Sequence, residues 1–286
     1  SILYLIMISL LNRTIIHIIF FSRLCGQIDF YVSEFRLFPD EIQMLDLQPD
    51  MVQWSVAGRF LLLDKMAQQL IGLGLIGDVQ MVGGFGRQNY TFVEPVWMGV
   101  TPGGILVVDR LDNRIISLDY RLNFIHSSVL EPRIFPELAA VDPWGELFLY
   151  SSQYHSIFSV KRGVIDPIPH IDLNTYSDIR SCVREIAVNQ DGTIGVLTCD
   201  DDVHLFSKLG QYRRSIPALL SKTYFLVPLR NDWFVFDQDG NGVSILDNVK
   251  LEIPGVSVPV MDIKGLNRSI AVLSKDHILI LNVQYQ

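Results

Sequence analysis

The sequence predicts an all-β fold, a six-bladed β-propeller of four-stranded antiparallel blades, and three observations support this. Short apolar stretches alternate with clusters of Asp, Asn and Gly from Gln27 onward. The 3.6-residue periodicity of amphipathic helices is scarce along the same stretch, so strands are expected. A unit of about 40 residues then recurs six times, and this is the length of one propeller blade.

Each repeat contains a tight turn between its first two strands. The residues that mark these turns are Gly58, Gly104, Gly145, Gly192, Asn231 and Asn267. Successive markers lie 46, 41, 47, 39 and 36 residues apart. The second strands are predicted at 59–64, 105–109, 146–150, 193–198, 233–237 and 269–274. Four tryptophans on or beside the inner strands are predicted to pack between blades, namely Trp54, Trp97, Trp144 and Trp233.

The ring is predicted to be closed by a strand from the N-terminal side of the chain. The last repeat offers three strands, near 258–263, 269–274 and 278–283. A fourth strand is expected, because an uncovered strand edge would pair with other chains. Two strand-like pieces precede the first repeat, at 28–38 and 42–47, and one of them is expected to supply the outer strand of the last blade.

Residues 1–26 are predicted to form a signal peptide. If Met7 is the true start, a short basic region precedes an apolar run at 14–21 and a polar end before Gln27. This is the layout of a secretory signal. The mature chain, 27–286, would then be a single propeller domain that is periplasmic, held at the cell surface or secreted.

Two alternatives to cleavage remain open. The segment could stay in place as a membrane anchor, although Arg13 near the bilayer centre would cost roughly 2.5–3.5 kcal/mol. Lipid modification of Cys25 is the second alternative, although Arg23 and Leu24 are larger than the residues that a lipoprotein signal prefers. Contact with a membrane is expected only through this segment, if it is uncleaved.

One repeat, residues 83–128, carries a recognisable motif. It contains Gly83-Gly84-Phe85-Gly86, Phe92-Val93-Glu94-Pro95, Gly104-Ile105-Leu106-Val107-Val108-Asp109 and Asn113-Arg114-Ile115. This stretch resembles an NHL repeat, whereas the other five repeats keep its spacing and lose most of its letters. The resemblance implies a six-bladed propeller of a family that includes lyases, lactonases and binding platforms.

The turns between second and third strands carry most of the candidate functional residues. In an NHL-like blade they share one face with the loops that lead into the first strands. A ligand or partner face is predicted from Asp109, Arg110, Tyr154, His155, Asp200, Asp201, Asp202, Asp237, Asp239, Asp276 and His277. A ring of carboxylates favours a basic protein or a small cationic ligand. The alternative is a structural role, because Asp and Asn bond to their own backbone in turns.

The most metal-like stretch is Asp237-Gln238-Asp239-Gly240-Asn241. Alternating oxygen ligands resemble the start of a calcium loop, with Asp237, Asp239 and Asn241 as candidates. A glutamate does not close the set where such a loop needs it, since Glu252 comes too late. A hairpin turn explains the same residues. We therefore expect no cofactor, with a divalent cation such as calcium as the alternative.

Recognisable catalytic motifs are absent from the sequence, which has no Gly-x-Ser-x-Gly, His-Glu-x-x-His or Cys-x-x-Cys. The resemblance implies two enzyme classes. A lyase would place histidines on an axial zinc, for which His155 and His277 lie on the expected face. A lactonase would place Glu, Asn and Asp on an axial divalent metal, for which Glu94, Glu185 and Asn189 are candidates.

Cys182 and Cys199 are a candidate disulfide, since they flank the first two strands of the fourth repeat. If Asn189 faces Gly192 across the turn, the two cysteines lie directly opposite, at a distance that a disulfide accepts. If Gln190 faces Thr193, Cys199 faces Arg184 instead. The alternative is a pair of buried free thiols.

The composition limits the function classes. Basic residues number 23 and acidic residues 31, for a net charge of -8, which disfavours a nucleic-acid partner. The 49% apolar content excludes a disordered chain. We expect an exported binding or scaffold propeller without catalytic activity that contacts a protein or small ligand on the loop face. The alternative is a metal-dependent hydrolase or lactonase acting at the central channel.

Overall fold

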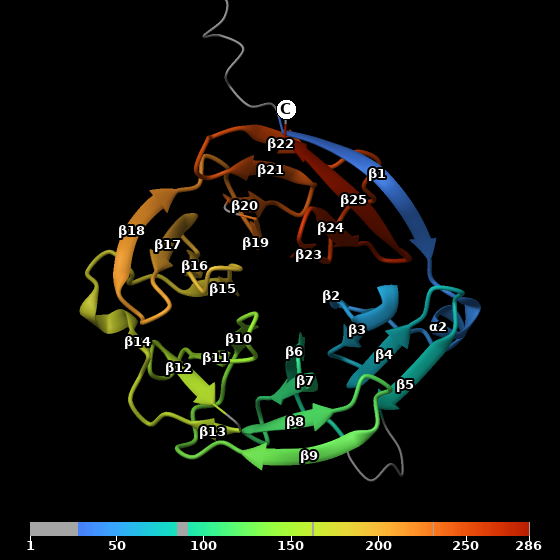
Figure 1. The fold of residues 1–286 in the computed structure, drawn as a ribbon, viewed down its shortest axis with the longest axis horizontal. Coiled ribbons are helices and arrows are strands. Elements are labelled where there is room, and N and C mark those ends of the chain that lie inside the picture. Colours follow the sequence, from blue (N-terminus) through green and yellow to red (C-terminus); the bar gives the residue numbers. More distant parts are fainter. Residues whose placement is uncertain (1–27, 85–90, 162, 231, 286) are drawn as a thin grey trace, which may run out of the picture.

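The computed structural model describes residues 28–84, 91–161, 163–230 and 232–285, and it confirms the six-bladed β-propeller. Six antiparallel sheets stand around a central axis (Figure 1). The predicted signal peptide, residues 1–26, lies outside the described residues. Within the described part of the chain, no helix is long and apolar enough to cross a membrane.

The first three blades follow the chain from the innermost strand outward. The first blade contains β2 (Met51–Trp54), β3 (Phe60–Asp64), β4 (Gln69–Leu73) and β5 (Val79–Gly83), with the 3-10 turn η1 (Val56–Gly58). The second contains β6 (Pro95–Thr101), β7 (Gly104–Asp109), β8 (Arg114–Leu118) and β9 (Phe124–Val129). The third contains β10 (Leu138–Val141), β11 (Leu147–Ser151), β12 (Ser156–Lys161), β13 (Val164–Ile165) and β14 (Ile171–Asp172), followed by the 3-10 turn η2 (Leu173–Thr175).

The other three blades repeat this order. The fourth contains β15 (Val183–Val188), β16 (Ile194–Thr198), β17 (Asp202–Phe206) and β18 (Tyr212–Pro217). The fifth contains β19 (Phe225–Leu229), β20 (Asp232–Phe236), β21 (Asn241–Ser244) and β22 (Lys250–Glu252). The sixth contains β23 (Asp262–Leu266), β24 (Ser269–Leu273), β25 (His277–Tyr285) and, from the other end of the chain, β1 (Ile28–Leu37).

Strand β1 closes the ring as expected. It pairs with β25 along its whole length, from Ile28 opposite Tyr285 to Leu37 opposite His277. The second strand-like piece, 42–47, is not a strand. It lies in the short helix α2 (Asp40–Met44) and the turn that follows it. Two acidic residues open this helix, where they favour the helix N-terminus, and only Ile42 of the helix is buried.

Apolar clusters fill the spaces between neighbouring blades. The cluster between the sixth and first blades, for example, joins Ile280 and Leu273 to Phe60 and Ile71. Because both faces of each blade are covered, second strands such as β3 and β20 are buried at every residue and are almost entirely apolar. Trp97 and Trp233 are buried in such clusters as predicted. The prediction for Trp144 was wrong, since it lies in an exposed turn with 59% of its surface accessible.

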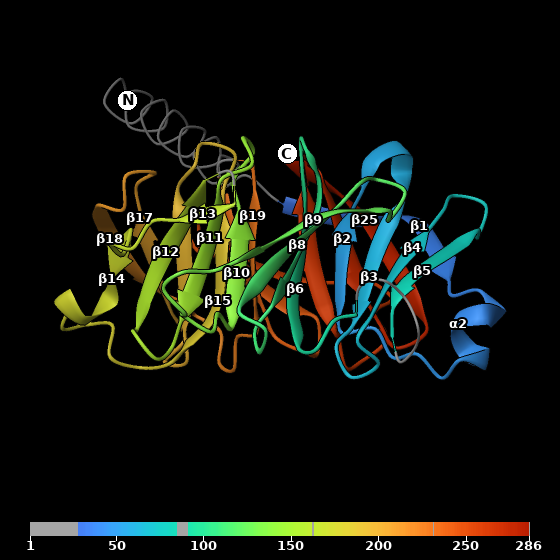
Figure 2. The same ribbon diagram turned by 90° about the horizontal axis from the view of Figure 1, so that it is seen from below.

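The alternating strand directions give the propeller two distinct faces. The turns between second and third strands and the loops that join blades lie on one face, the lower side of Figure 2, here called the lower face. The turns between first and second strands lie on the opposite, upper face. The predicted partner residues therefore share the lower face.

Candidate functional site

The innermost strands of the six blades surround the propeller axis (Figure 1), and the cavity between them is here called the channel. Strands β2, β6, β10, β15, β19 and β23 line a cavity of about 320 Å³. An innermost strand has no neighbouring strand on its channel side. Half of its backbone N–H and C=O groups therefore face the axis and need other partners.

A charged cluster satisfies several of these groups on one side of the channel. The Lys264 ammonium lies 2.7 Å from Oε1 of Glu185 and 3.2 Å from Oδ1 of Asp262. Oε2 of Glu185 accepts a hydrogen bond from the backbone N–H of Leu226. Oδ2 of Asp262 accepts a hydrogen bond from the backbone N–H of Val52. Strands β15 and β23 belong to the fourth and sixth blades, so this cluster connects blades that are not neighbours.

Burial controls the ionisation of the cluster. The side chains of Glu185, Lys264 and Asp262 are only 15%, 24% and 7% exposed. Desolvation raises the pKa of Glu185, against the opposing effect of the Lys264 ammonium. Burial alone would lower the pKa of Lys264, but the carboxylates of Asp262 and Glu185 outweigh it and raise that pKa. Lys264 is therefore a permanent cation between two carboxylates.

The channel wall on the other side carries no charged side chain. It is formed by β6 and β10, whose lining residues are Val96, Trp97, Met98, Leu138, Ala139, Ala140 and Val141. The channel thus has one wall with charged side chains and one wall without them. Its lower end is lined by Asp50, Lys65, Arg184 and Tyr224.

On the lower face, one backbone hydrogen bond recurs in every blade. The residue that follows the outermost strand donates its N–H to a carbonyl in the turn between the second and third strands. The donor and acceptor pairs are Gly84 and Gln68, Leu130 and Asn113, Leu173 and His155, Ala218 and Asp201, Ile253 and Gly240, and Phe38 and Asp276. Five of the acceptors have positive φ, a conformation that favours Gly, Asn and Asp. This requirement explains much of the turn composition.

Several predicted partner residues make structural contacts in these turns. Asp109 is fully buried and accepts hydrogen bonds from the N–H groups of Val93 and Glu94. Asp201 accepts from the N–H groups of Lys222 and Thr223, which lead into the next blade. These carboxylates hold the interblade loops in place.

Two predicted histidines are likewise held within the fold. His155 donates from Nε2 to the Ile179 carbonyl, and its Nδ1 lies 3.1 Å from the Tyr150 hydroxyl. His277 is 1% exposed, with Nδ1 2.7 Å from the Asp276 carboxylate. The two histidines belong to the third and sixth blades and do not converge.

The calcium-like stretch forms a closed turn. The Asp237 carboxylate accepts hydrogen bonds from the N–H groups of Asp239 and Asn241 and from the Asn241 amide. These hydrogen bonds are those of a hairpin turn, which was the alternative to a calcium loop. Among the residues that the structure describes, no group of three or more His, Cys, Asp or Glu side chains could hold a metal ion.

The remaining lower-face residues are accessible. Arg110 is paired with Glu94 at 2.8 Å, and Tyr154 is 42% exposed. Five acidic residues around the fourth and fifth blades make no ion pair within the described chain. This acidic sector consists of Asp178, Asp200, Asp202, Asp237 and Asp239.

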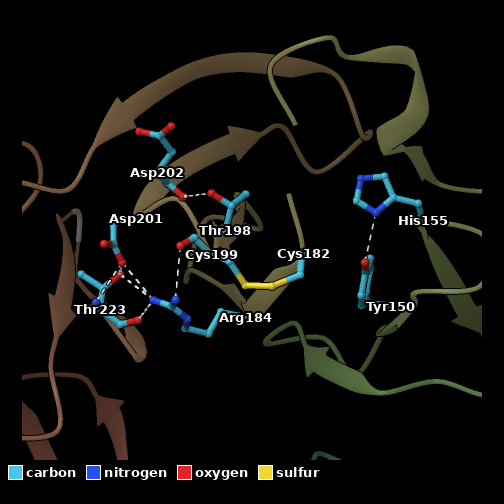
Figure 3. Close-up of a disulfide and its surroundings, with 9 residues drawn as sticks. All are labelled: Tyr150, His155, Cys182, Arg184, Thr198, Cys199, Asp201, Asp202 and Thr223. Atoms are coloured by element: carbon cyan, nitrogen blue, oxygen red, sulfur yellow. Dashed lines mark hydrogen bonds and ion pairs between the residues drawn. A yellow bond between two sulfur atoms is a disulfide. The ribbon is translucent and has the colours of Figure 1, made fainter. Parts of the chain in front are cut away.

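The structure joins Cys182 and Cys199 in a disulfide beside Arg184 (Figure 3). Their Cα atoms are 5.4 Å apart. The hairpin follows neither predicted register, because Val188 faces Ile194 and a bulge at Arg184 then shifts the pairing by one residue. The bulge brings the cysteines opposite each other and directs Arg184 toward Asp201 and Thr223.

Of the three lactonase candidates, only Glu185 lies in the channel. Glu94 is on the lower face, and Asn189 is in an upper-face turn, where it accepts a hydrogen bond from the Gln190 N–H. Asp262 and Lys264 were not predicted from the sequence as site residues. The sequence pattern that could have predicted them is Asp262-Ile263-Lys264 in an innermost strand. Residues two apart lie on the same side of a strand, so this pattern predicts that the two charged side chains lie together.

Comparison with known proteins supports the fold alone. A family-model scan and a search of curated proteins find no match. Virginiamycin B lyase from Staphylococcus aureus is similar in structure, with a TM-score of 0.64 and 13% identity over 89% of this chain and 99% of the lyase. BBS1N, in a complex with ARL6DN, has a TM-score of 0.56 and 10% identity over 82% and 78%. The predicted NHL assignment thus has no support from a family model.

Proposed function

We propose that this protein is an exported binding propeller, without catalytic activity of its own, that receives a basic protein partner on its lower face. The observation that carries the proposal is the acidic sector. Its five carboxylates lack ion-pair partners within the described chain, whereas Asp109 and Asp201 are engaged in holding loops. The five carboxylates outnumber the exposed basic residues of the same loops, Arg180 and Lys222. An excess of surface charge of one sign attracts partners of the opposite sign and speeds their association.

Export is part of the proposal. The disulfide between Cys182 and Cys199 supports it, because such bonds persist in oxidising compartments. The signal-like layout of residues 1–26 is consistent with the same route.

A propeller of this shape suits either binding or catalysis. BBS1N is a structural neighbour that is found in a protein complex, and the lyases are neighbours that are enzymes. The hydrolase alternative needs oxygen ligands that are open to a metal on the axis. In the channel, Glu185 and Asp262 each use one carboxylate oxygen to accept a backbone N–H, and among the described residues no group of three or more His, Cys, Asp or Glu side chains could hold a metal ion. Elemental analysis after dialysis tests this alternative, and a stoichiometric divalent ion would support it.

The binding proposal is tested by neutralising the acidic sector. The triple variant Asp200→Asn, Asp202→Asn, Asp239→Asn removes three charges without touching Asp201 or Asp237, which make turn contacts. The probe is a lysine-rich peptide, titrated calorimetrically at low salt. We expect its Kd to rise by about tenfold or more.

The matched control removes three exposed carboxylates elsewhere. It combines Glu41→Gln, Asp46→Asn and Asp247→Asn, none of which belongs to the sector. We expect its peptide affinity to stay within about twofold of the parent. Equal losses in the two variants would show that only net charge matters, and this result would overturn the proposal.

A further inference from the structure

The central channel contains a charged cluster that is not part of the acidic sector on the lower face. Two carboxylates, Glu185 and Asp262, share a single ammonium, Lys264, so the cluster has one cationic group fewer than it has carboxylates. All three side chains are largely buried and line the same cavity. Leaving a buried carboxylate without full compensation is costly, and a further cation would relieve that cost.

The lining and the volume of the cavity restrict the chemical group that can carry the cation. The wall formed by β6 and β10 has no charged side chain among its lining residues, and its partly exposed side chains are Val96, Leu138 and Val141. A ligand bound there would contact these three aliphatic side chains on one side and the charged cluster on the other. The cavity volume of about 320 Å³ lies at the small end of the range of ligand pockets, about 300–1,000 Å³, so it suits a small ligand.

We propose that the channel binds a small amphiphilic monocation, an amine with an apolar body, whose ammonium contacts Glu185 and Asp262 and whose body packs on β6 and β10. The lower end of the cavity is the route of access, where the lining residues are Asp50, Lys65, Arg184 and the 41% exposed Tyr224. The charge of Arg184 is paired with Asp201. This site is separate from the acidic sector and does not depend on it.

The test compares two probes of the same shape and different charge. 2-Phenylethylamine is protonated at pH 7.5, whereas 2-phenylethanol is neutral, and each is titrated into the full chain by calorimetry. We expect the amine to bind at least about tenfold more tightly than the alcohol, since a charge-assisted contact in a buried site is stronger than a neutral one. Equal affinity for the two probes would overturn the proposal.

Two channel variants give opposite expected results. Glu185→Gln keeps an acceptor for the Leu226 N–H but removes the charge, and we expect it to abolish the preference for the amine. Lys264→Met removes the internal ammonium, and we expect the amine to bind more tightly or, if the variant is unstable, to raise its Tm more than the alcohol does. An unchanged preference in Glu185→Gln would contradict the proposal.

The acidic-sector triple variant is the matched control. It leaves the channel residues intact, so we expect it to bind the amine as the parent does. Loss of amine binding in this variant would place the amine on the lower face and overturn the channel site. Loss of peptide binding with retained amine binding would show that the two sites are independent.

Discussion

Cys182 and Cys199 form a covalent bond at a position where other blades use hydrogen bonds. Cys182 immediately precedes an innermost strand, and Cys199 is the first residue after the second strand. The corresponding pair in the second blade is Glu94 and Arg110, joined by a backbone hydrogen bond and an ion pair. In the third blade, Glu137 accepts hydrogen bonds from the Ser152 N–H and hydroxyl. The fourth blade keeps the backbone hydrogen bond, from the Cys199 N–H to the Cys182 carbonyl, and has a disulfide in place of the polar side-chain contact.

The disulfide is expected to contribute measurably to stability. It closes a separation of 17 residues, for which loop entropy predicts about 3 kcal/mol. We expect the Cys182→Ser, Cys199→Ser variant to lose about that free energy of unfolding in urea. Mass spectrometry of the unreduced protein is the direct measurement, and two alkylatable thiols at these positions would refute the bond.

The closing strand is expected to depend on its inward side chains. Phe30 is partly buried against Phe234 and Phe236, whereas Val32 is 45% exposed. Phe30→Ala should cost about 2–3 kcal/mol, and the control Val32→Ala about 0.5 kcal/mol or less. Similar losses in chemical denaturation would indicate that the register of β1 differs.

Substitutions of two neighbouring aspartates, Asp200 and Asp201, are expected to differ in their effect on the free energy of unfolding. Asp201 accepts hydrogen bonds from Lys222, Thr223 and Arg184, whereas Asp200 is exposed. Asp201→Ala should destabilise the protein by about 2–3 kcal/mol, because it leaves buried donors unpaired. Asp200→Ala should change the free energy of unfolding by about 0.5 kcal/mol or less. If both variants unfold at the same urea concentration, the assigned role of Asp201 is wrong.

A buried histidine makes stability depend on pH. His204 is 1% exposed, and neither ring nitrogen has a hydrogen-bond partner within the described chain. Burial lowers its pKa, against the opposing carboxylates of Asp202 and Asp178. The unfolded chain therefore binds a proton at higher pH than the folded chain does, and stability falls as pH drops below about 6.5.

The variant His204→Leu isolates this contribution. We expect its loss of stability between pH 7 and pH 5 to be smaller than that of the parent, measured as the shift in urea midpoint. A loss of the same size in both proteins would show that other groups carry the pH dependence.

The sequence by itself determined the blades and their order. Strand positions follow from short apolar runs, and turn positions follow from Gly, Asn and Asp, because both depend on local sterics and burial. The closing strand was also predictable, since an uncovered edge demands a partner. The choice between 28–38 and 42–47 was not, because both are apolar enough for a strand and only packing against the first blade favours a helix around Ile42.

Only the tertiary structure decided the site. Glu185 and Lys264 are 79 residues apart and come from blades that are not neighbours, so their contact exists only once the ring is closed. The bulge at Arg184, which sets the disulfide register, is likewise absent from the pattern of apolar residues. Local sequence specifies strands and turns through backbone preference and burial. Which charged groups face each other across the axis depends on the radial position and register of each innermost strand, and these are set by packing between blades.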